Sequence, residues 1–200
     1  ETVFTRKMVL TDVQSNDREF TYDGTAKIPT VIVASGDRTL TEGTDYAVVA
    51  PDDGVSVGSK TLIVKGVGSY SGEKTIDYEI TAAPITDLTL DADKLTYDGT
   101  EQVPALTVKA GELVLDPKTD FDVATSDDIT TKTVKVTAKG NFEGALEESY
   151  EIVAAGIDTI ELSADKFTYD GTDKTPAITV KAGDKTLVAG TDYELTLPTN

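Results

Sequence analysis

Tyr97-Asp98-Gly99-Thr100 decides the architecture of this chain, because the same four residues occur three times. The other copies are Tyr22-Asp23-Gly24-Thr25 and Tyr169-Asp170-Gly171-Thr172. Successive copies lie 75 and 72 residues apart, and each has a proline four residues after its threonine. Asp-Gly is a tight-turn dipeptide in which glycine supplies a positive φ and aspartate bonds its own backbone. The chain is therefore a series of repeats, each containing what we call the YDG turn.

Two further motifs support the repeat. A Thr-Asp-aromatic motif recurs at the same two offsets, and residues 91–123 match residues 163–195 at 18 of 33 positions. A Gly-x-aromatic-x-Gly motif, the aromatic loop, occurs at 68–72 and 140–144, which lie 72 residues apart. The first repeat therefore carries three extra residues, which we expect in a turn around Pro51-Asp52-Asp53-Gly54 because loops tolerate insertions. The Thr-Asp-aromatic motif begins at Thr44, Thr119 and Thr191.

These motifs divide the chain into modules. Module one is expected at 7–82, module two at 85–154, and an incomplete module three at 157–200. Residues 1–6 resemble the trailing strand of a preceding module. The joints Ala82-Ala83-Pro84 and Ala154-Ala155-Gly156 are short, so we expect tight hinges between the modules and not long flexible linkers.

Short runs rich in Val, Ile, Thr and Tyr, bounded by Gly, Pro, Asp and Asn, predict β-strands throughout. Residues 133–139 alternate apolar and polar side chains, which is typical of a strand with one buried face. Seven short strands in about 72 residues predict an all-β fold of tandem immunoglobulin-like β-sandwich modules, arranged end to end as a rod. A β-grasp fold is the main rival, but no segment has the pattern of a helix. In module two the strands are expected at 85–90, 94–97, 105–109, 112–115, 121–124, 131–139 and 146–153.

Each motif has a structural interpretation. The tyrosine of the YDG turn would lay its ring on the core while its hydroxyl reaches a turn or joint. The aspartate of the Thr-Asp-aromatic motif would cap a turn through backbone N–H groups, and its aromatic neighbour would enter the core. The aromatic loop would plug the core between two strands. Recurrence favours these roles over ligand contact, because a fold is needed in every module and an active site only once.

Charge limits the classes of partner. The net charge is −18, from 36 acidic and 18 basic residues. This disfavours nucleic acid and anionic membrane surfaces, which need a basic face. The acids are scattered along the chain, as on a solvated and self-repelling surface; their grouping into calcium sites is the alternative. No stretch is apolar for the roughly 18 residues that a membrane helix requires, and Glu1 begins no recognisable signal peptide. A mature chain, a fragment of a precursor and a chain that is never secreted remain open.

The chain has no Cys and no His, and this limits its chemistry. Disulfides and thiol catalysis are excluded, so stability must come from packed cores. Without histidine the Ser-His-Asp and Cys-His schemes and the usual zinc sites are impossible. We therefore predict that the chain is not an enzyme, with no catalytic, cofactor-binding or metal-binding residues and no cofactor.

The motifs together resemble the YDG-type bacterial immunoglobulin-like repeats, which are mostly-β, glycine-rich tandem modules of large surface proteins. In module two the pattern reads Tyr97-Asp98-Gly99, Pro104, Thr119-Asp120-Phe121, Gly140–Gly144 and Ile152. Module two departs from it at Lys118, where the other modules have Gly43 and Gly190, and module three lacks its second half. The resemblance implies a repeated stalk segment that projects a functional tip.

These observations predict a non-catalytic stalk or spacer of an extracellular, adhesin-like protein of the bacterial cell surface. The expected partners are the flanking modules of a longer chain. One alternative is an adhesive module that binds a glycan or host protein directly, although the absence of Trp weakens a carbohydrate-stacking platform. The other is a phage virion or fibre protein with the same repeats.

Three smaller expectations concern chain ends and crosslinks. Module three is expected to hold five of seven strands, up to 193–197, which would leave an open edge. We therefore expect the chain to continue with two strands, or, less favoured, another copy to donate strands, with Thr2–Arg6 as a candidate donor. A Lys–Asn isopeptide at the equivalent Lys60 and Lys132 is disfavoured, because no asparagine recurs in both modules beside an acid. A sortase signal at Leu197–Asn200 is discounted. The apolar residues expected to meet water are Ile160, Phe167, Ile178, Val180 and Leu187.

Overall fold

The computed structural model describes residues 7–126 and 131–196, and all regular elements in that part of the chain are β-strands. The predicted all-β class is therefore confirmed. The predicted strand at Thr2–Arg6 and the segment Leu197–Asn200 lie outside the described residues. Contacts separate the chain into two compact units that are interleaved in sequence. Unit one comprises 1–89, 106–124 and 135–148, and unit two comprises 90–105, 125–134 and 149–200.

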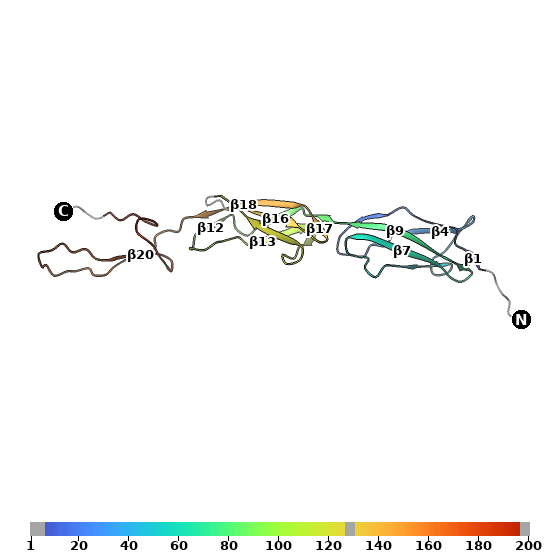
Figure 1. Ribbon diagram of the computed structural model, residues 1–200, viewed down its shortest axis with the longest axis horizontal. Coiled ribbons are helices and arrows are strands. Elements are labelled where there is room, and N and C mark those ends of the chain that lie inside the picture. Colours follow the sequence, from blue (N-terminus) through green and yellow to red (C-terminus); the bar gives the residue numbers. More distant parts are fainter. Residues whose placement is uncertain (1–6, 127–130, 197–200) are drawn as a thin grey trace. The chain divides into compact units, whose positions relative to one another are not determined.

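Module one lies wholly in unit one and forms two principal sheets. Their strand orders are β2-β4-β5 and β3-β9-β7-β6, and a small parallel pair joins β1 to β8. Strands β7 and β9 pair antiparallel from Gly58–Ile80 to Lys65–Glu73 and lie side by side in Figure 1. The strands are β1 (Met8–Val9), β2 (Asp12–Ser15), β3 (Glu19–Thr21), β4 (Val31–Ser35), β5 (Arg38–Thr39), β6 (Tyr46–Val49), β7 (Gly58–Gly66), β8 (Tyr70–Ser71) and β9 (Glu73–Thr81).

The core of module one lies between these sheets. Along β9 the side chains of Ile76, Tyr78 and Ile80 are buried and those between them are exposed, as a pleated strand with one covered face requires. Leu62 and Val64 of β7 are fully buried, and Val33 of the other sheet packs in the same cluster as Val64. The sheets therefore share one apolar interior, which is the main favourable term available to a chain without disulfides.

Module two repeats this topology. Its sheets run β11-β13-β14 and β12-β18-β16-β15, which correspond strand for strand to those of module one. All seven predicted strands are present, with ends that differ by no more than two residues. Val134 and Val136 of β16 are fully buried while Lys135 is exposed, so the predicted alternation is confirmed. The strands are β10 (Ala83–Pro84), β11 (Asp87–Leu90), β12 (Lys94–Thr96), β13 (Leu106–Ala110), β14 (Leu113–Val114), β15 (Phe121–Thr125), β16 (Thr131–Ala138), β17 (Phe142–Glu143) and β18 (Ala145–Val153).

The extra three residues of module one fall where they were predicted. Eight residues, 50–57, connect β6 to β7, whereas five, 126–130, connect β15 to β16. The longer connection is tied down by Asp53, whose Oδ1 accepts from the backbone N–H groups of Val55 and Ser56 at 3.0 Å. The insertion thus carries its own turn-forming carboxylate.

Parallel strand pairs distinguish the module from a purely antiparallel sandwich. Strand β3 pairs in parallel with β9, with Phe20 opposite Ile80, and β12 pairs likewise with β18, with Leu95 opposite Ile152. Parallel neighbours need a long crossover, and here the crossover contains the intervening strands of the module. The last strand of module one and the last strand of module two are thereby each fixed beside one of the first strands of the same module.

Module three lies wholly in unit two and forms a single sheet, β19-β20-β21. The prediction of a strand at 193–197 was wrong for the described residues 193–196, which are not in a strand. Residues 166–169, equivalent to β12, are not in a strand either. Both segments lack a partner strand. In modules one and two the equivalent strands β6 and β15 pair with β7 and β16, and the equivalent strands β3 and β12 pair with β9 and β18. Module three has no counterpart of these partner strands among the described residues. The three strands are β19 (Thr159–Leu162), β20 (Ile178–Ala182) and β21 (Lys185–Thr186).

Several apolar side chains of module three are exposed, because its described residues form only one sheet. Ile160 is 63% and Phe167 47% exposed, as expected, and Ile178 and Leu187 are half-buried. The expectation was wrong for Val180, which is only 2% exposed. Val180 lies in the central strand of its sheet, opposite Ile160 of β19.

Candidate functional site

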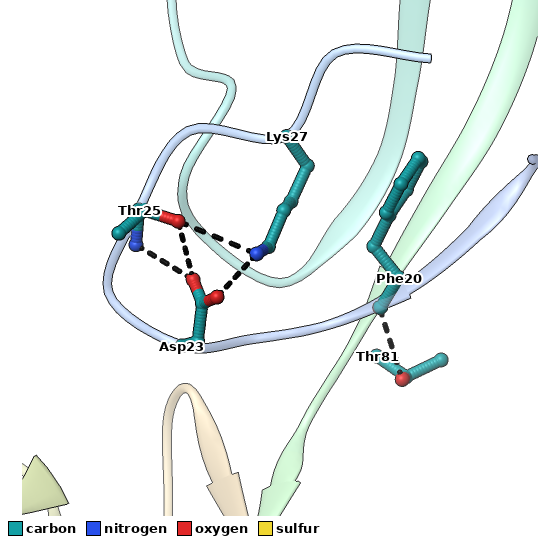
Figure 2. A network of polar contacts seen from close by, with 5 residues as sticks. All are labelled: Phe20, Asp23, Thr25, Lys27 and Thr81. Atoms are coloured by element: carbon teal, nitrogen blue, oxygen red, sulfur yellow. Dashed lines mark hydrogen bonds and ion pairs between the residues drawn. The ribbon is translucent and has the colours of Figure 1, made fainter. Parts of the chain in front are cut away.

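The YDG turn of module one is closed by a local carboxylate network (Figure 2). Asp23 Oδ1 accepts the backbone N–H and the hydroxyl of Thr25 at 2.9 and 2.6 Å. The Lys27 ammonium donates to Asp23 Oδ2 and, at 3.3 Å, to Thr25 Oγ1. Gly24 has a φ of 80°, which a residue with a Cβ adopts only with strain. The turn therefore needs its aspartate, glycine and threonine for its own geometry.

The same network recurs in the other modules. Asp98 Oδ1 accepts from Thr100 N–H and hydroxyl at 2.9 and 2.6 Å, and Asp170 Oδ1 accepts from the corresponding groups of Thr172 at 3.1 and 2.7 Å. Lys174 lies 2.5 Å from Asp170, as Lys27 pairs with Asp23. Module two has Gln102 at that position. The predicted tight turn with positive φ at glycine is confirmed in all three copies.

Electrostatics at these turns follow from the network. The Lys27 ammonium, helped by the Thr25 hydroxyl and N–H, lowers the pKa of Asp23 from 3.8 to about 2. Hydrogen bonds from Lys174 and Thr172 lower the pKa of Asp170, and those from Thr100 lower the pKa of Asp98. A carboxylate with a depressed pKa carries no proton to give near neutral pH. These aspartates are suited to holding turns and not to general acid catalysis.

The tyrosines of the three YDG turns lie in different environments. Tyr22 is half-buried and packs edge to face on Phe142, with ring centroids 5.3 Å apart. Tyr97 is 43% exposed and lies beneath the Lys185 ammonium, which is 4.6 Å from the ring centroid. Tyr169 is 87% exposed. The prediction that this tyrosine lies on a core is therefore confirmed for Tyr22 and wrong for Tyr169, which no second sheet covers among the described residues.

The Thr-Asp-aromatic motif behaves as predicted in modules one and two. Asp45 is buried and its Oδ2 accepts the N–H of Thr41 at 3.0 Å, while Tyr46 is only 6% exposed. Asp120 Oδ2 accepts the N–H of Asp116 at 2.8 Å, and Phe121 is 2% exposed. In module three the turn is also present, with Val188 N–H donating to Asp192 Oδ2 at 2.9 Å.

The aromatic loop is a plug, as predicted, and within unit one it also makes contacts beyond module two. Phe142 is 7% exposed in the core of module two, and Tyr22 packs against that core. Asn141 Oδ1 accepts the backbone N–H of Val57 at 3.0 Å. The predicted hinge residues Ala83 and Pro84 form β10, which pairs in parallel with β17. Backbone pairing therefore fixes these joint residues to module two, and a side-chain hydrogen bond and an aromatic pair connect module two to module one.

Two tyrosines in the last strands were not predicted to have a role. Tyr78 donates its hydroxyl to the carbonyl of Lys27 at 2.7 Å, and Tyr150 donates to the carbonyl of Gln102 at 3.0 Å. These carbonyls occupy equivalent positions just after the YDG turn. Burial raises the pKa of both phenols, more than their neighbouring carboxylates do. The sequence Tyr-Glu-Ile recurs at 78–80 and 150–152, and this recurrence could have indicated that the two tyrosines share a role.

The remaining candidate groups have ordinary partners. Lys60 pairs with Asp53 at 3.2 Å, and Lys132 donates to the carbonyl of Ser126 at 3.4 Å, so neither of these partners is an asparagine. Throughout residues 7–126 and 131–196 no group of three or more acidic side chains is placed to hold a metal ion. No helix in the described chain is long and apolar enough to cross a membrane.

Unit two contains an open groove beside the YDG turn of module two. It has a volume of about 510 Å³ and runs from Tyr97 and Asp98 to Lys185. A smaller cavity of about 160 Å³ adjoins it. The smaller cavity is lined mainly by apolar side chains, among them Ala155, Ile157, Ala182 and Leu187.

The chain matches no protein-family model, no curated protein and no solved structure.

Proposed function

We propose that this chain is a non-catalytic spacer segment built from YDG-type immunoglobulin-like modules, and that the modules stack as the stalk of an extracellular, adhesin-like surface protein. The observation that carries the proposal is the use of the repeated motifs. Asp23, Asp98 and Asp170 each accept hydrogen bonds from the threonine of their own turn. Residues that recur for this purpose maintain a fold that is copied along a chain.

The ordered joint supports the same function. A spacer must keep its two ends apart, and a joint whose residues are ordered by pairing with β17 and which is bridged by the Asn141–Val57 hydrogen bond resists bending better than a loose linker. The net charge of −18 keeps such a chain soluble and discourages modules from packing side by side.

Small-angle scattering on the 200-residue chain tests the proposal. We expect an extended particle to which each module contributes roughly 30–40 Å, on the scale of strands that rise about 3.3 Å per residue. A compact particle with modules packed side by side would contradict it. A glycan array and a glycosidase screen serve as the second arm: specific glycan binding would favour the adhesive alternative, and turnover would contradict the non-catalytic assignment.

A further inference from the structure

Unit two contains a cavity whose counterpart in module two is filled by an aromatic ring. We call the four apolar residues Ala155, Ile157, Ala182 and Leu187 the socket, with Tyr97 at its rim. Each socket residue lies 72 positions after a residue of the module-two core, and Tyr97 lies 75 after Tyr22. Those counterparts are Ala83, Ile85, Ala110 and Leu115, and they enclose Phe142, with Tyr22 packed against the cluster.

Exposure shows that the socket is open. Ile157 is 52% exposed, whereas Ile85 is 8% exposed; Ile160 is 63% exposed, whereas Leu88 is 8% exposed. Module one repeats the filled arrangement, because Leu10 and Leu40 pack with Tyr70 of its own aromatic loop. Two modules thus show the same apolar residues covered by the ring of an aromatic loop, and module three shows them in contact with water.

The backbone around the socket is also prepared for a strand. In unit one the N–H groups of Ala83 and Ile85 donate to the carbonyls of Asn141 and Glu143 at 3.0 Å, and Lys139 N–H donates to the Asp120 carbonyl at 2.8 Å. The equivalent groups in module three are the N–H groups of 155 and 157 and the carbonyl of 192. None of the three meets a backbone partner within the described part of unit two. Open backbone groups beside an apolar pocket are the elements of strand addition, in which pairing gives affinity and the pocket gives specificity.

We propose that the socket is a binding site for one class of partner, a β-hairpin of the sequence type of residues 131–153 that carries Gly-x-aromatic-x-Gly at its turn. The aromatic ring would enter the socket against Tyr97, and the strand that carries it would pair in parallel with residues 155–157. This inference concerns a binding surface of module three and does not depend on the stalk function.

The test uses the full 200-residue chain and a synthetic peptide of residues 131–153 with Phe142→Trp. The peptide has three lysines and four glutamates, which favours solubility, and the chain has no Trp, so indole fluorescence reports the peptide alone. We expect saturable binding with a blue-shifted emission, and slower amide exchange in 155–162 and 178–187 with no change in module one. In competition against the fluorescent peptide, a peptide with Phe142→Ala should bind at least about tenfold more weakly than the native sequence, because a buried ring is lost.

Two matched variants of the chain complete the test. Ile157→Asp should abolish peptide binding without changing the melting temperature of the free chain, because Ile157 is already half exposed. Val114→Asp, at a 66% exposed position of module two, should bind the peptide like the parent chain. No saturable binding, protection outside module three, or equal loss in both variants would overturn the proposal. Self-association of the chain that Ile157→Asp abolishes, with no response to peptide, would overturn it in favour of a second copy as the occupant.

Discussion

At the scale of single residues, the three YDG turns show how one motif is adjusted by its neighbours. The Asp–Thr pair is constant, whereas the residue four positions after the aspartate is Lys27, Gln102 or Lys174. The tyrosine ranges from half-buried at 22 to 87% exposed at 169. The turn is thus encoded locally, while the environment of its tyrosine depends on what packs beside it.

Gly99→Val is expected to destabilise module two by more than about 1 kcal/mol, because Gly99 has a φ of 94° and an added Cβ would lie 3.3 Å from Lys185 Cδ. Chemical denaturation followed by circular dichroism measures the loss. Gly156→Ala is the control, since Gly156 has no positive φ and an added Cβ there meets nothing within 4 Å. If the Gly99→Val chain unfolded like the parent but lost a binding activity, the turn would instead be a loop that contacts a ligand.

Lys27→Met is expected to raise the pKa of Asp23 toward that of Asp98, where the lysine is naturally absent. The pKa of Asp23 is depressed from 3.8 to about 2, so its contribution to stability is present above pH 3.8 and is lost as pH falls toward 2. NMR titration of the side-chain carboxyl carbons measures both values. The pKa of Asp23 should stay below the ordinary range in the variant, because Thr25 still donates. An unchanged value would show that Lys27 has no part in the network.

Two buried tyrosines of module one should respond oppositely to loss of the hydroxyl. Tyr78→Phe is expected to cost about 1 kcal/mol, because it leaves the Lys27 carbonyl without its donor. Tyr70→Phe should be neutral or stabilising, since the Tyr70 hydroxyl is buried with no partner among the described residues, and module two has Phe142 at that position. Urea denaturation compares the variants, with the exposed Tyr169→Phe as control. A larger loss for Tyr70→Phe than for Tyr78→Phe would contradict this assignment.

At the scale of elements, the sequence predicted most of what local patterns encode. The seven strands of module two follow from alternation and turn residues, and Val134 and Val136 are buried as expected. The two-residue strands β10 and β17 were not predicted, because they form by pairing with each other across 59 positions of sequence and are too short to show a pattern of their own. The contacts of Asn141 and of the Tyr78 hydroxyl depend on long-range packing that no local pattern contains. The strand expected at 193–197 failed for the same reason, since a strand needs a partner as well as a suitable sequence.

At the scale of the whole molecule, the three modules share a sequence pattern but differ in how much of it is covered. Modules one and two each have a core with side chains from two sheets, whereas module three has one sheet of three strands. Stability should therefore be distributed unevenly along the chain, because local opening is cheapest where few apolar contacts are lost.

Hydrogen exchange should reveal this distribution at three equivalent valines. Val33, Val108 and Val180 lie on equivalent strands and are 1%, 1% and 2% exposed. We expect the amides of β20 around Val180 to exchange faster than those of β4 and β13, since only β20 lacks a facing sheet. Mass spectrometry of peptides that cover the three strands provides the measurement. Equal protection would mean that a single sheet suffices to hold module three.

The parallel pairing of first and last strands has a mechanical consequence. Tension between the ends of a module would pull β3 toward its start and β9 toward its end, along a shared line of hydrogen bonds. Those bonds would be loaded in shear, so that they must break together, and not peeled apart one at a time. The pairing of β12 with β18 places the same load on module two. A module of this kind would hold its length under a steady pull and yield abruptly.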